Sequence, residues 1–147
     1  MEICNSILSY YDFSEEVDTI SLSYEERFMR RKKLVSDKGH EFLVDLEEMR
    51  SVVSNQAFKL ESGKLITIKS KKENLIEIKS KDLNKLIWHI GNRHIPCQIE
   101  ATRILIQSDH IIENMVRRLG GQTKSVIEQF NPEGGAYGMG RTHGHKH

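Results

Sequence analysis

Histidines are the residues of this chain whose type and spacing are best suited to chemistry. The sequence holds seven, and three of them, His143, His145 and His147, fall within the last five residues. Imidazole nitrogen is a ligand suited to nickel, copper and zinc. Alternate spacing in a flexible chain lets several rings turn toward one ion, and the interrupted series differs from the consecutive run of an affinity tag. The pattern predicts metal binding by the tail; a plain polar tail is the alternative.

His110 is the second candidate ligand, and it falls in the first turn of a predicted helix that begins after Asp109. It projects with Asn114 and Arg117, outside the apolar stripe. The helix dipole disfavours positive charge near an N-terminus, which keeps the imidazole neutral, while Asp109 acts in the opposite direction. Taken alone, His110 is more simply a surface histidine, but a two-fold axis can set it beside its own equivalent and complete a metal site. The expected stripe consists of Ile111, Ile112, Met115, Val116 and Leu119.

The remaining histidines in helices and turns have simpler explanations. His89 lies on an earlier predicted helix and is expected to be partly packed. His94 follows that helix, where bracing the turn by a hydrogen bond is favoured over metal binding. His40 falls in a predicted hairpin turn and is expected to be solvated. None of the three is therefore predicted to be a ligand.

Catalytic apparatus is absent from the sequence. There is no GxxxxGK[ST] loop, no GxGxxG, no HExxH, no GxSxG and no cysteine-rich zinc pattern. The two cysteines, Cys4 and Cys97, lack CxxC spacing and are expected to be free thiols in a reducing compartment. No nucleophile is paired with a base, so the protein is not expected to be an enzyme.

Composition excludes several classes of partner. Lys and Arg number 22 against 21 for Asp and Glu, so the formal net charge of +1 favours neither nucleic acid nor membrane. No apolar run approaches the roughly 18 residues of a membrane span, and the N-terminus lacks the basic region of a signal peptide. A cytoplasmic location is expected. One basic run, Arg27 and residues 30–33, is either a solvated face or a docking site for an acidic protein surface.

The elements that must position these residues fall into three parts. Residues 1–72 are predicted to form a small all-β domain, a barrel or sandwich, with hairpins around Gly39 and Gly63. Residues 73–133 have the order βαββαβ, a ferredoxin-like arrangement. Asp82 is expected to cap the first helix and Gly91 to end it. Residues 134–147 form a glycine- and histidine-containing flexible tail, and the fold class is α+β.

Three motifs in this order resemble the urease accessory proteins E (UreE). Residues 88–96, WHIGNRHIP, are similar to that family's GNRHxP segment, and residues 109–115, DHIIENM, to its DHVLxxM helix. Residues 134–138, followed by His143 and His145, resemble its GAY motif and histidine tail. Residues 24–27, the basic run, Gly39 and residues 45–46 match its N-terminal domain more loosely. Together these segments cover nearly the whole chain, and their order is specific.

The resemblance implies a homodimeric nickel metallochaperone rather than an enzyme. It implies an N-terminal domain that contacts partners or peptides, and C-terminal domains that dimerise so that His110 of both chains shares one Ni(II). It further implies delivery of nickel to urease apoprotein together with the accessory GTPase of that pathway. Some members carry a long polyhistidine tail, whereas this chain has three tail histidines. Transfer of nickel is therefore expected rather than storage.

Two alternatives share the predicted fold. An RNA-binding module is also βαββαβ, but it needs stacking aromatics on its central strands, and residues 103–107 contain none. A copper- or zinc-handling protein is the other, because a histidine site binds Cu(II) more tightly than Ni(II) in the Irving–Williams order.

Overall fold

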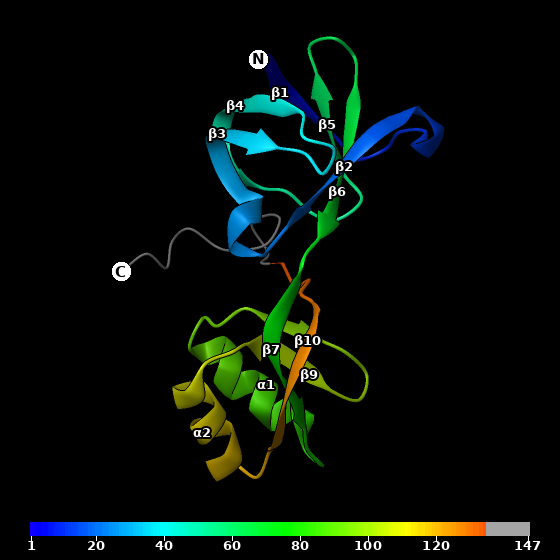
Figure 1. Ribbon diagram of the computed structural model, residues 1–147. Helices are drawn as coiled ribbons and strands as arrows, with labels where there is room; N and C mark the ends of the chain where they lie inside the picture. The colour runs from blue at the N-terminus through cyan, green and yellow to red at the C-terminus, as the bar shows by residue number, and fades with distance from the viewer. Residues whose placement is uncertain (135–147) are drawn as a thin grey trace. The chain divides into compact units, whose positions relative to one another are not determined.

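A computed structural model describes residues 1–134 of the chain. They belong to two compact units, the first Met1–Lys71 and the second beginning at Lys72 (Figure 1). Mixed sheets and two helices confirm the predicted α+β class. Neither helix in the described part of the chain is long and apolar enough to cross a membrane.

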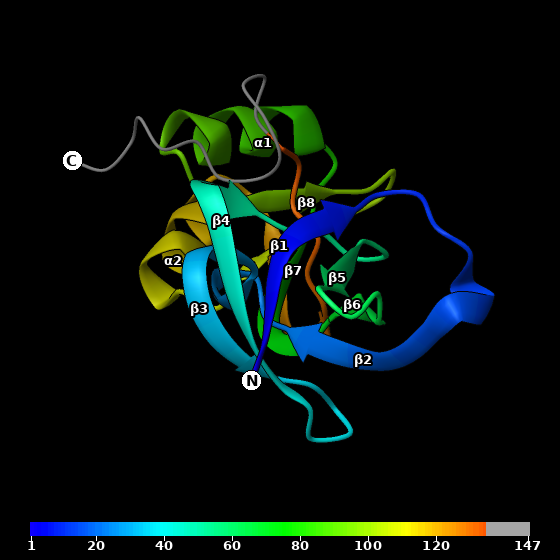
Figure 2. The ribbon, with the colours of Figure 1, turned by 90° about the horizontal axis from the view of Figure 1, so that it is seen from above.

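The first unit is built on a six-stranded sheet in the order β2-β6-β5-β1-β4-β3. β1 lies between β4 and β5 (Figure 2). The β1–β4 and β2–β6 pairs are parallel, and the other pairs are antiparallel. Two short 3-10 turns, η1 (Phe13–Glu15) and η2 (Glu25–Arg27), precede β2 and β3. The strands are β1 (Glu2–Leu8), β2 (Glu16–Leu22), β3 (Phe28–Val35), β4 (Glu41–Ser51), β5 (Ala57–Leu60) and β6 (Leu65–Ser70).

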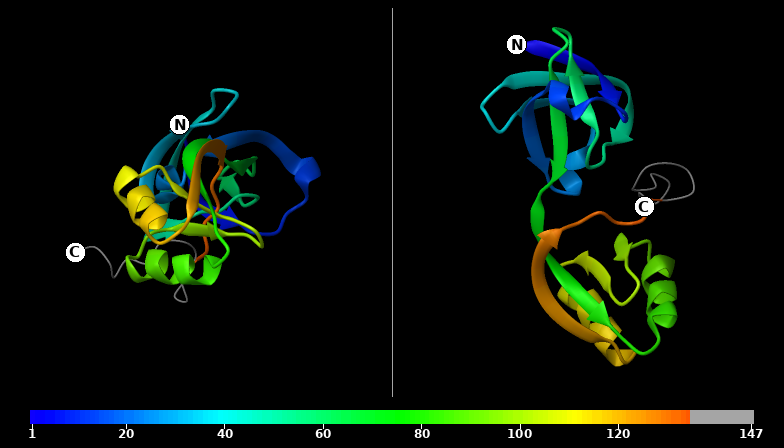
Figure 3. Two further views of the ribbon diagram at one scale, coloured as in Figure 1. Left: turned by 90° about the horizontal axis from the view of Figure 1, so that it is seen from below. Right: turned by 90° about the vertical axis from the view of Figure 1, so that its right-hand side faces the viewer.

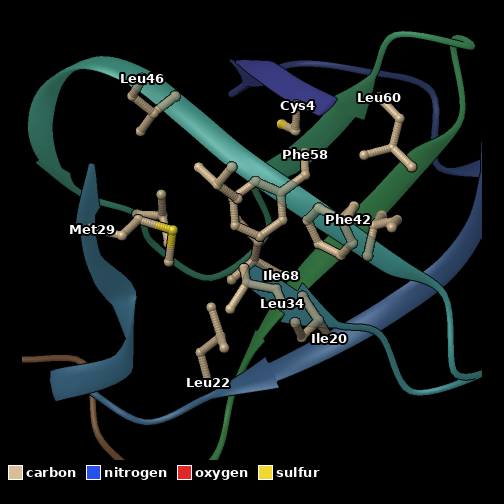
Figure 4. Close-up of a cluster of buried hydrophobic side chains, with 13 residues drawn as sticks. Cys4, Ile20, Leu22, Met29, Leu34, Phe42, Leu46, Phe58, Leu60 and Ile68 are labelled. Carbon is tan, nitrogen blue, oxygen red and sulfur yellow. The ribbon is translucent and has the colours of Figure 1, made fainter. Parts of the chain in front are cut away.

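Both predicted hairpins are present, and each turns at a glycine. Gly39 and Gly63 have φ near +90°, the left-handed region that costs glycine little. The strands bury their alternate side chains in one cluster (Figure 4), where the rings of Phe42 and Phe58 lie 5.4 Å apart. Burial of these apolar side chains is the main force that holds this unit together.

The second unit has a four-stranded antiparallel sheet in the order β10-β7-β9-β8. Both helices pack on one face of it, through Leu86 and Ile90 of α1 and Val116 of α2 (Figure 3). The order of elements along the chain is the predicted βαββαβ. The elements are β7 (Lys72–Lys79), α1 (Leu83–Asn92), β8 (Cys97–Ile99), β9 (Ile104–Gln107), α2 (His110–Arg118) and β10 (Gln122–Gln129).

The helix ends confirm one predicted cap and correct another. Asp82 accepts a hydrogen bond from the Lys85 amide and starts α1, as expected. The prediction that Gly91 ends α1 was wrong. The helix continues to Asn92, and the left-handed residue is His94, with φ 58°. The His94 amide still donates to the Gly91 carbonyl at 3.0 Å, so the turn is closed two residues later than glycine placement indicated.

Candidate metal centre

His110 is the first residue of α2, and the local sequence fixes it there. The Asp109 carboxylate caps the helix by accepting hydrogen bonds from the amides of Ile111 at 2.9 Å and Ile112 at 3.2 Å. His110 is exposed, together with Asn114 as predicted. Within residues 1–134, no hydrogen bond or ion pair engages the His110 ring. Its nitrogens are therefore accessible to an ion from outside the chain.

The apolar surface beside His110 differs from the predicted stripe. Ile112, Met115 and Leu119 pack against the core as expected. Ile111 does not, because 67% of it is exposed to solvent, so its assignment to the buried stripe was wrong. The physical reason is its angular position. Val116 is the fully buried residue of α2, and at about 100° per residue Ile111 lies roughly 140° around the helix from it, outside the buried face.

A second exposed isoleucine lies on the neighbouring strand. Ile127 of β10 is 68% exposed. Glu113 and Arg117 of α2 both hydrogen-bond to Thr123 of β10, at 2.7 and 2.8 Å, which fixes the level of the strand against the helix. Ile127 is four residues, about 13 Å, further along β10 at the usual strand rise. Because β10 runs antiparallel to α2, Ile127 lies from Thr123 in the direction of the N-terminal end of the helix, which carries His110 and the exposed Ile111.

Residues 130–134, which lead to the tail, lie at the end of the sheet from which α2 begins. The Asn131 amide donates to Gln98 Oε1 at 2.8 Å, and the Glu133 amide donates to the Cys97 carbonyl at 2.9 Å. Cys97 pairs with Ile106, two residues before the loop that begins α2. Motif analysis did not foresee this placement, because it depends on contacts between residues more than thirty positions apart.

The other candidate residues are not brought together into a ligand cluster. Among residues 1–134, no group of three or more His, Cys, Asp or Glu side chains has a geometry suited to a metal ion. His89 is partly buried, as predicted, and its ring meets Trp88 edge-on at 5.0 Å. His40 is exposed, as predicted: 44% of its side chain is accessible, and its Nε2 lies 3.9 Å from Asp18 Oδ2. His143, His145 and His147 lie outside the described residues.

Both cysteines are free, as the sequence predicted, and both are buried. Burial raises the pKa of the Cys4 thiol, and it also raises the pKa of Cys97. A thiol held protonated is a poor metal ligand, since the thiolate is the coordinating form. In their present environments these side chains are therefore core residues.

The face of the second sheet that the helices leave open is acidic rather than aromatic. Arg103 is held there by Glu77 at 2.9 Å, Glu100 at 2.9 Å and Glu128 at 2.7 Å. Hydrogen bonds to Glu128, Glu100 and Glu77 raise the pKa of Arg103 above its ordinary value, and Arg103 lowers that of Glu128. An RNA surface of this fold needs stacking rings and free positive charge. No strand of this sheet carries an aromatic residue, and the Arg103 charge is taken up by the three glutamates, which disfavours the RNA-binding alternative.

The basic run of the first unit is not a uniform charged face. Arg27 is 3% exposed, and its Nη1 donates to Ser70 Oγ at 2.7 Å. Arg31 is ion-paired to Asp45 at 3.4 Å. The prediction that the whole basic run forms one solvated or docking surface was therefore wrong for Arg27. Residue type alone does not distinguish a buried arginine from an exposed one.

Comparison with known proteins gives one consistent result. Residues 73–147 match the family model described as UreE urease accessory protein, C-terminal domain. A urease accessory protein UreE from Ruegeria pomeroyi is 49% identical over 98% of this chain and 97% of its own length. Those from Rhodobacter capsulatus and Paracoccus denitrificans are 47% and 45% identical, over 100% and 84% of this chain and 94% and 79% of their own lengths.

Proposed function

Because the chain belongs to the UreE family of urease accessory proteins, we propose that it is a nickel chaperone that delivers Ni(II) to urease apoprotein. The family consists of accessory proteins, and the chain is accordingly not an enzyme. Its role in urease maturation follows from the family. We further propose that nickel is the cargo, that His110 is its principal ligand and that the protein is a homodimer.

The observation that carries the proposal is the exposed His110 ring on a capped helix, bordered by two exposed isoleucines. One imidazole holds a metal weakly, so a second copy must supply further ligands. Ile111 and Ile127 give that copy an apolar surface to cover, and burying each side chain contributes about 1.5–3 kcal/mol. A two-fold axis through this surface sets His110 beside His110 of the partner subunit.

The tail histidines can complete the coordination sphere. His143 follows Gly134 by nine positions, and an extended chain spans about 3.3 Å per position, or roughly 30 Å. The root of the tail lies at the end of the sheet from which α2 begins, so His143, His145 and His147 are within reach of an ion at His110. Cu(II) and Zn(II) suit the same ligands, and Cu(II) binds such a site more tightly.

Delivery requires partners besides a second copy of the chain. We propose that urease apoprotein receives the nickel and that the accessory GTPase of the pathway acts with the chaperone, in the cytoplasm. Nucleic acid and membrane are not expected partners, given the balanced charge. The first unit supplies protein-binding surface that does not involve His110.

The test is nickel calorimetry on His110→Ala beside His89→Ala, with circular dichroism on both. His110→Ala removes two ligands per dimer, and we expect a loss of at least about a hundredfold in affinity, since even outer-shell changes cost 10–100-fold. His89→Ala is the matched control, because His89 is also a helical histidine of the second unit. A folded His110→Ala protein that binds nickel as tightly as the parent would refute the proposed site.

A further inference from the structure

The chain changes edges of the second sheet after β10, immediately before the tail. β10 forms one edge of this sheet and β8 the other, in the order β10-β7-β9-β8. The amides of Asn131 and Glu133 nevertheless donate to groups of β8, namely Gln98 Oε1 at 2.8 Å and the Cys97 carbonyl at 2.9 Å. Three strand spacings measure about 14 Å, and four extended residues span about the same distance. Residues 130–133 therefore cross the whole sheet with almost no slack.

A network of half-buried polar side chains orients the group that accepts from Asn131. Gln98 Nε2 donates to Glu100 Oε2 at 2.7 Å, so the Gln98 Oε1 atom is the one that faces Asn131. Glu100 in turn accepts from Arg103 Nε at 2.9 Å. Arg103 also donates to both carboxylate oxygens of Glu128 in β10, at 2.7 and 2.8 Å. Because linked hydrogen bonds strengthen one another, the network fixes the Gln98 amide more firmly than one bond would.

The two halves of the crossing are held by different forces. Phe130 is fully buried, although it is the first residue after β10, so apolar burial secures the start. Asn131, Glu133 and Gly134 are exposed, so apolar burial does not hold the second half in the same way. The second half therefore depends on polar contacts, among them the two hydrogen bonds to β8.

The crossing sets both the length and the starting point of the tail. With it, His143 follows the last fixed residue, Glu133, by ten positions; without it, His143 follows Phe130 by thirteen. The fixed start lies beside β8, which pairs with Ile106, four positions before His110. The effective concentration of a tethered ligand falls as about the −3/2 power of tether length, so length alone contributes a factor of about 1.5. A fixed start adds to this factor, because fewer conformations are lost on binding.

We propose that Gln98 is a positioning residue for the tail histidines. Its side chain, oriented by Glu100, holds the Asn131 amide, so the tail begins at β8 and reaches the nickel ion as a short tether. The inference rests on the proposed nickel binding by the second unit. It adds to that proposal a residue that is not itself a ligand and that acts only through the tail.

The first test measures the anchoring itself, by amide hydrogen exchange on the full chain without metal. In Gln98→Ala, exchange of the Glu133 amide should accelerate about twofold to tenfold, since one hydrogen bond between neutral groups has that worth. Circular dichroism confirms that the variant is folded. The matched control is Gln122→Ala, because Gln122 is exposed in the same sheet but pairs with Lys79 at the opposite end of β10. Its Glu133 amide should exchange like that of the parent.

The second test is nickel titration against a competing chelator, on the parent and Gln98→Ala chains, each with and without alanine at His143, His145 and His147. We expect Gln98→Ala to weaken nickel binding about twofold to threefold when the tail histidines are present, and to have no effect when they are absent. Asn131→Pro removes the donor of the same hydrogen bond and leaves Gln98 intact, so it should reproduce this pattern.

Three results would overturn the proposal. One is equal weakening with and without the tail histidines, which would make the role of Gln98 merely structural. Another is unchanged Glu133 exchange in Gln98→Ala, and the third is unchanged nickel affinity of both variants although the parent binds nickel. A parent chain that binds no nickel would contradict the proposed function itself, so the two failures are distinguishable.

Discussion

A buried carboxylate in the first unit and an exposed histidine in the second show two opposite uses of a polar side chain. Asp18 is 3% exposed and accepts hydrogen bonds from Ser36 and from the amides of Thr19 and Lys38. His110 is exposed, and no hydrogen bond or ion pair among residues 1–134 engages its ring. Asp18 therefore contributes to the fold of the first unit, whereas the nitrogens of His110 stay accessible to an ion.

Each unit has its own apolar core, of thirteen buried side chains in the first and eight in the second. Both units also leave large apolar side chains exposed, but only in the second does such a side chain, Ile111, adjoin His110 in the described sequence. Exposed apolar side chains next to an exposed histidine are the surface that we propose a second copy covers. We therefore expect the stability of the first unit and nickel binding at the proposed site in the second to respond to different perturbations.

Lowering the pH should separate nickel release from unfolding of the first unit more than any other change. Metal ligation needs neutral imidazole, so nickel should be released as pH falls through about 6. Burial raises the pKa of Asp18, but hydrogen bonds from Ser36, Thr19 and Lys38 outweigh it, and the net shift is downward. Stability from a lowered carboxyl pKa is fully present above the unfolded value, about 3.9, and is lost as pH falls through the folded value.

We therefore expect a window between about pH 6 and pH 4 in which nickel is absent while the first unit stays folded. Nickel-dependent absorbance and far-ultraviolet circular dichroism, recorded on one acid titration, give the two curves. Coincident transitions would mean that unfolding, rather than protonation of the ligands, releases the metal.

A polar substitution at the exposed isoleucine should affect the second unit alone. Ile111→Gln keeps the fold, because the side chain is already 67% exposed. The substitution removes a buried apolar side chain from each side of the proposed two-fold interface. The dissociation constant of the dimer should therefore rise by at least about tenfold. Analytical ultracentrifugation measures the dimer, and nickel affinity should fall with it. Val35→Gln, at a 53% exposed residue of the first unit, is the control that should leave both unchanged.

Neutralising the buried carboxylate should affect the first unit alone. In Asp18→Asn, one acceptor oxygen becomes an amide donor facing the amides of Thr19 and Lys38, which should cost about 1–3 kcal/mol of unfolding free energy. Urea denaturation measures that loss. Nickel calorimetry at neutral pH on the folded variant should match the parent, and a large loss of affinity would show that the units are not independent.

Removing the tail should have the smallest effect. A chain that ends at Gly140 lacks His143, His145 and His147 but keeps His110. Because ordering a glycine-rich segment costs entropy, part of each ligand's gain is cancelled, and we expect nickel affinity to fall only about tenfold. Complete loss of binding in calorimetry would instead identify the tail as the principal ligand source.

Local patterns were sufficient for the elements that surround His110. Apolar spacing predicted both helices, and Asp82 caps the first as expected, because a cap depends on the next three residues alone. The second helix follows Asp109, as predicted. The two glycine turns of the first unit were likewise predictable. For the same reason, the exposure of His110 followed from its angle on the helix.

Contacts between distant segments decided the rest. Arg27 is buried and hydrogen-bonded to Ser70, 43 positions away in the chain. The parallel pairing of β1 with β4 has no local signature, because strand pairing joins residues some 40 positions apart. Periodicity reports which face of an element is apolar. Only the packed structure determines what covers that face, and what is left for a partner.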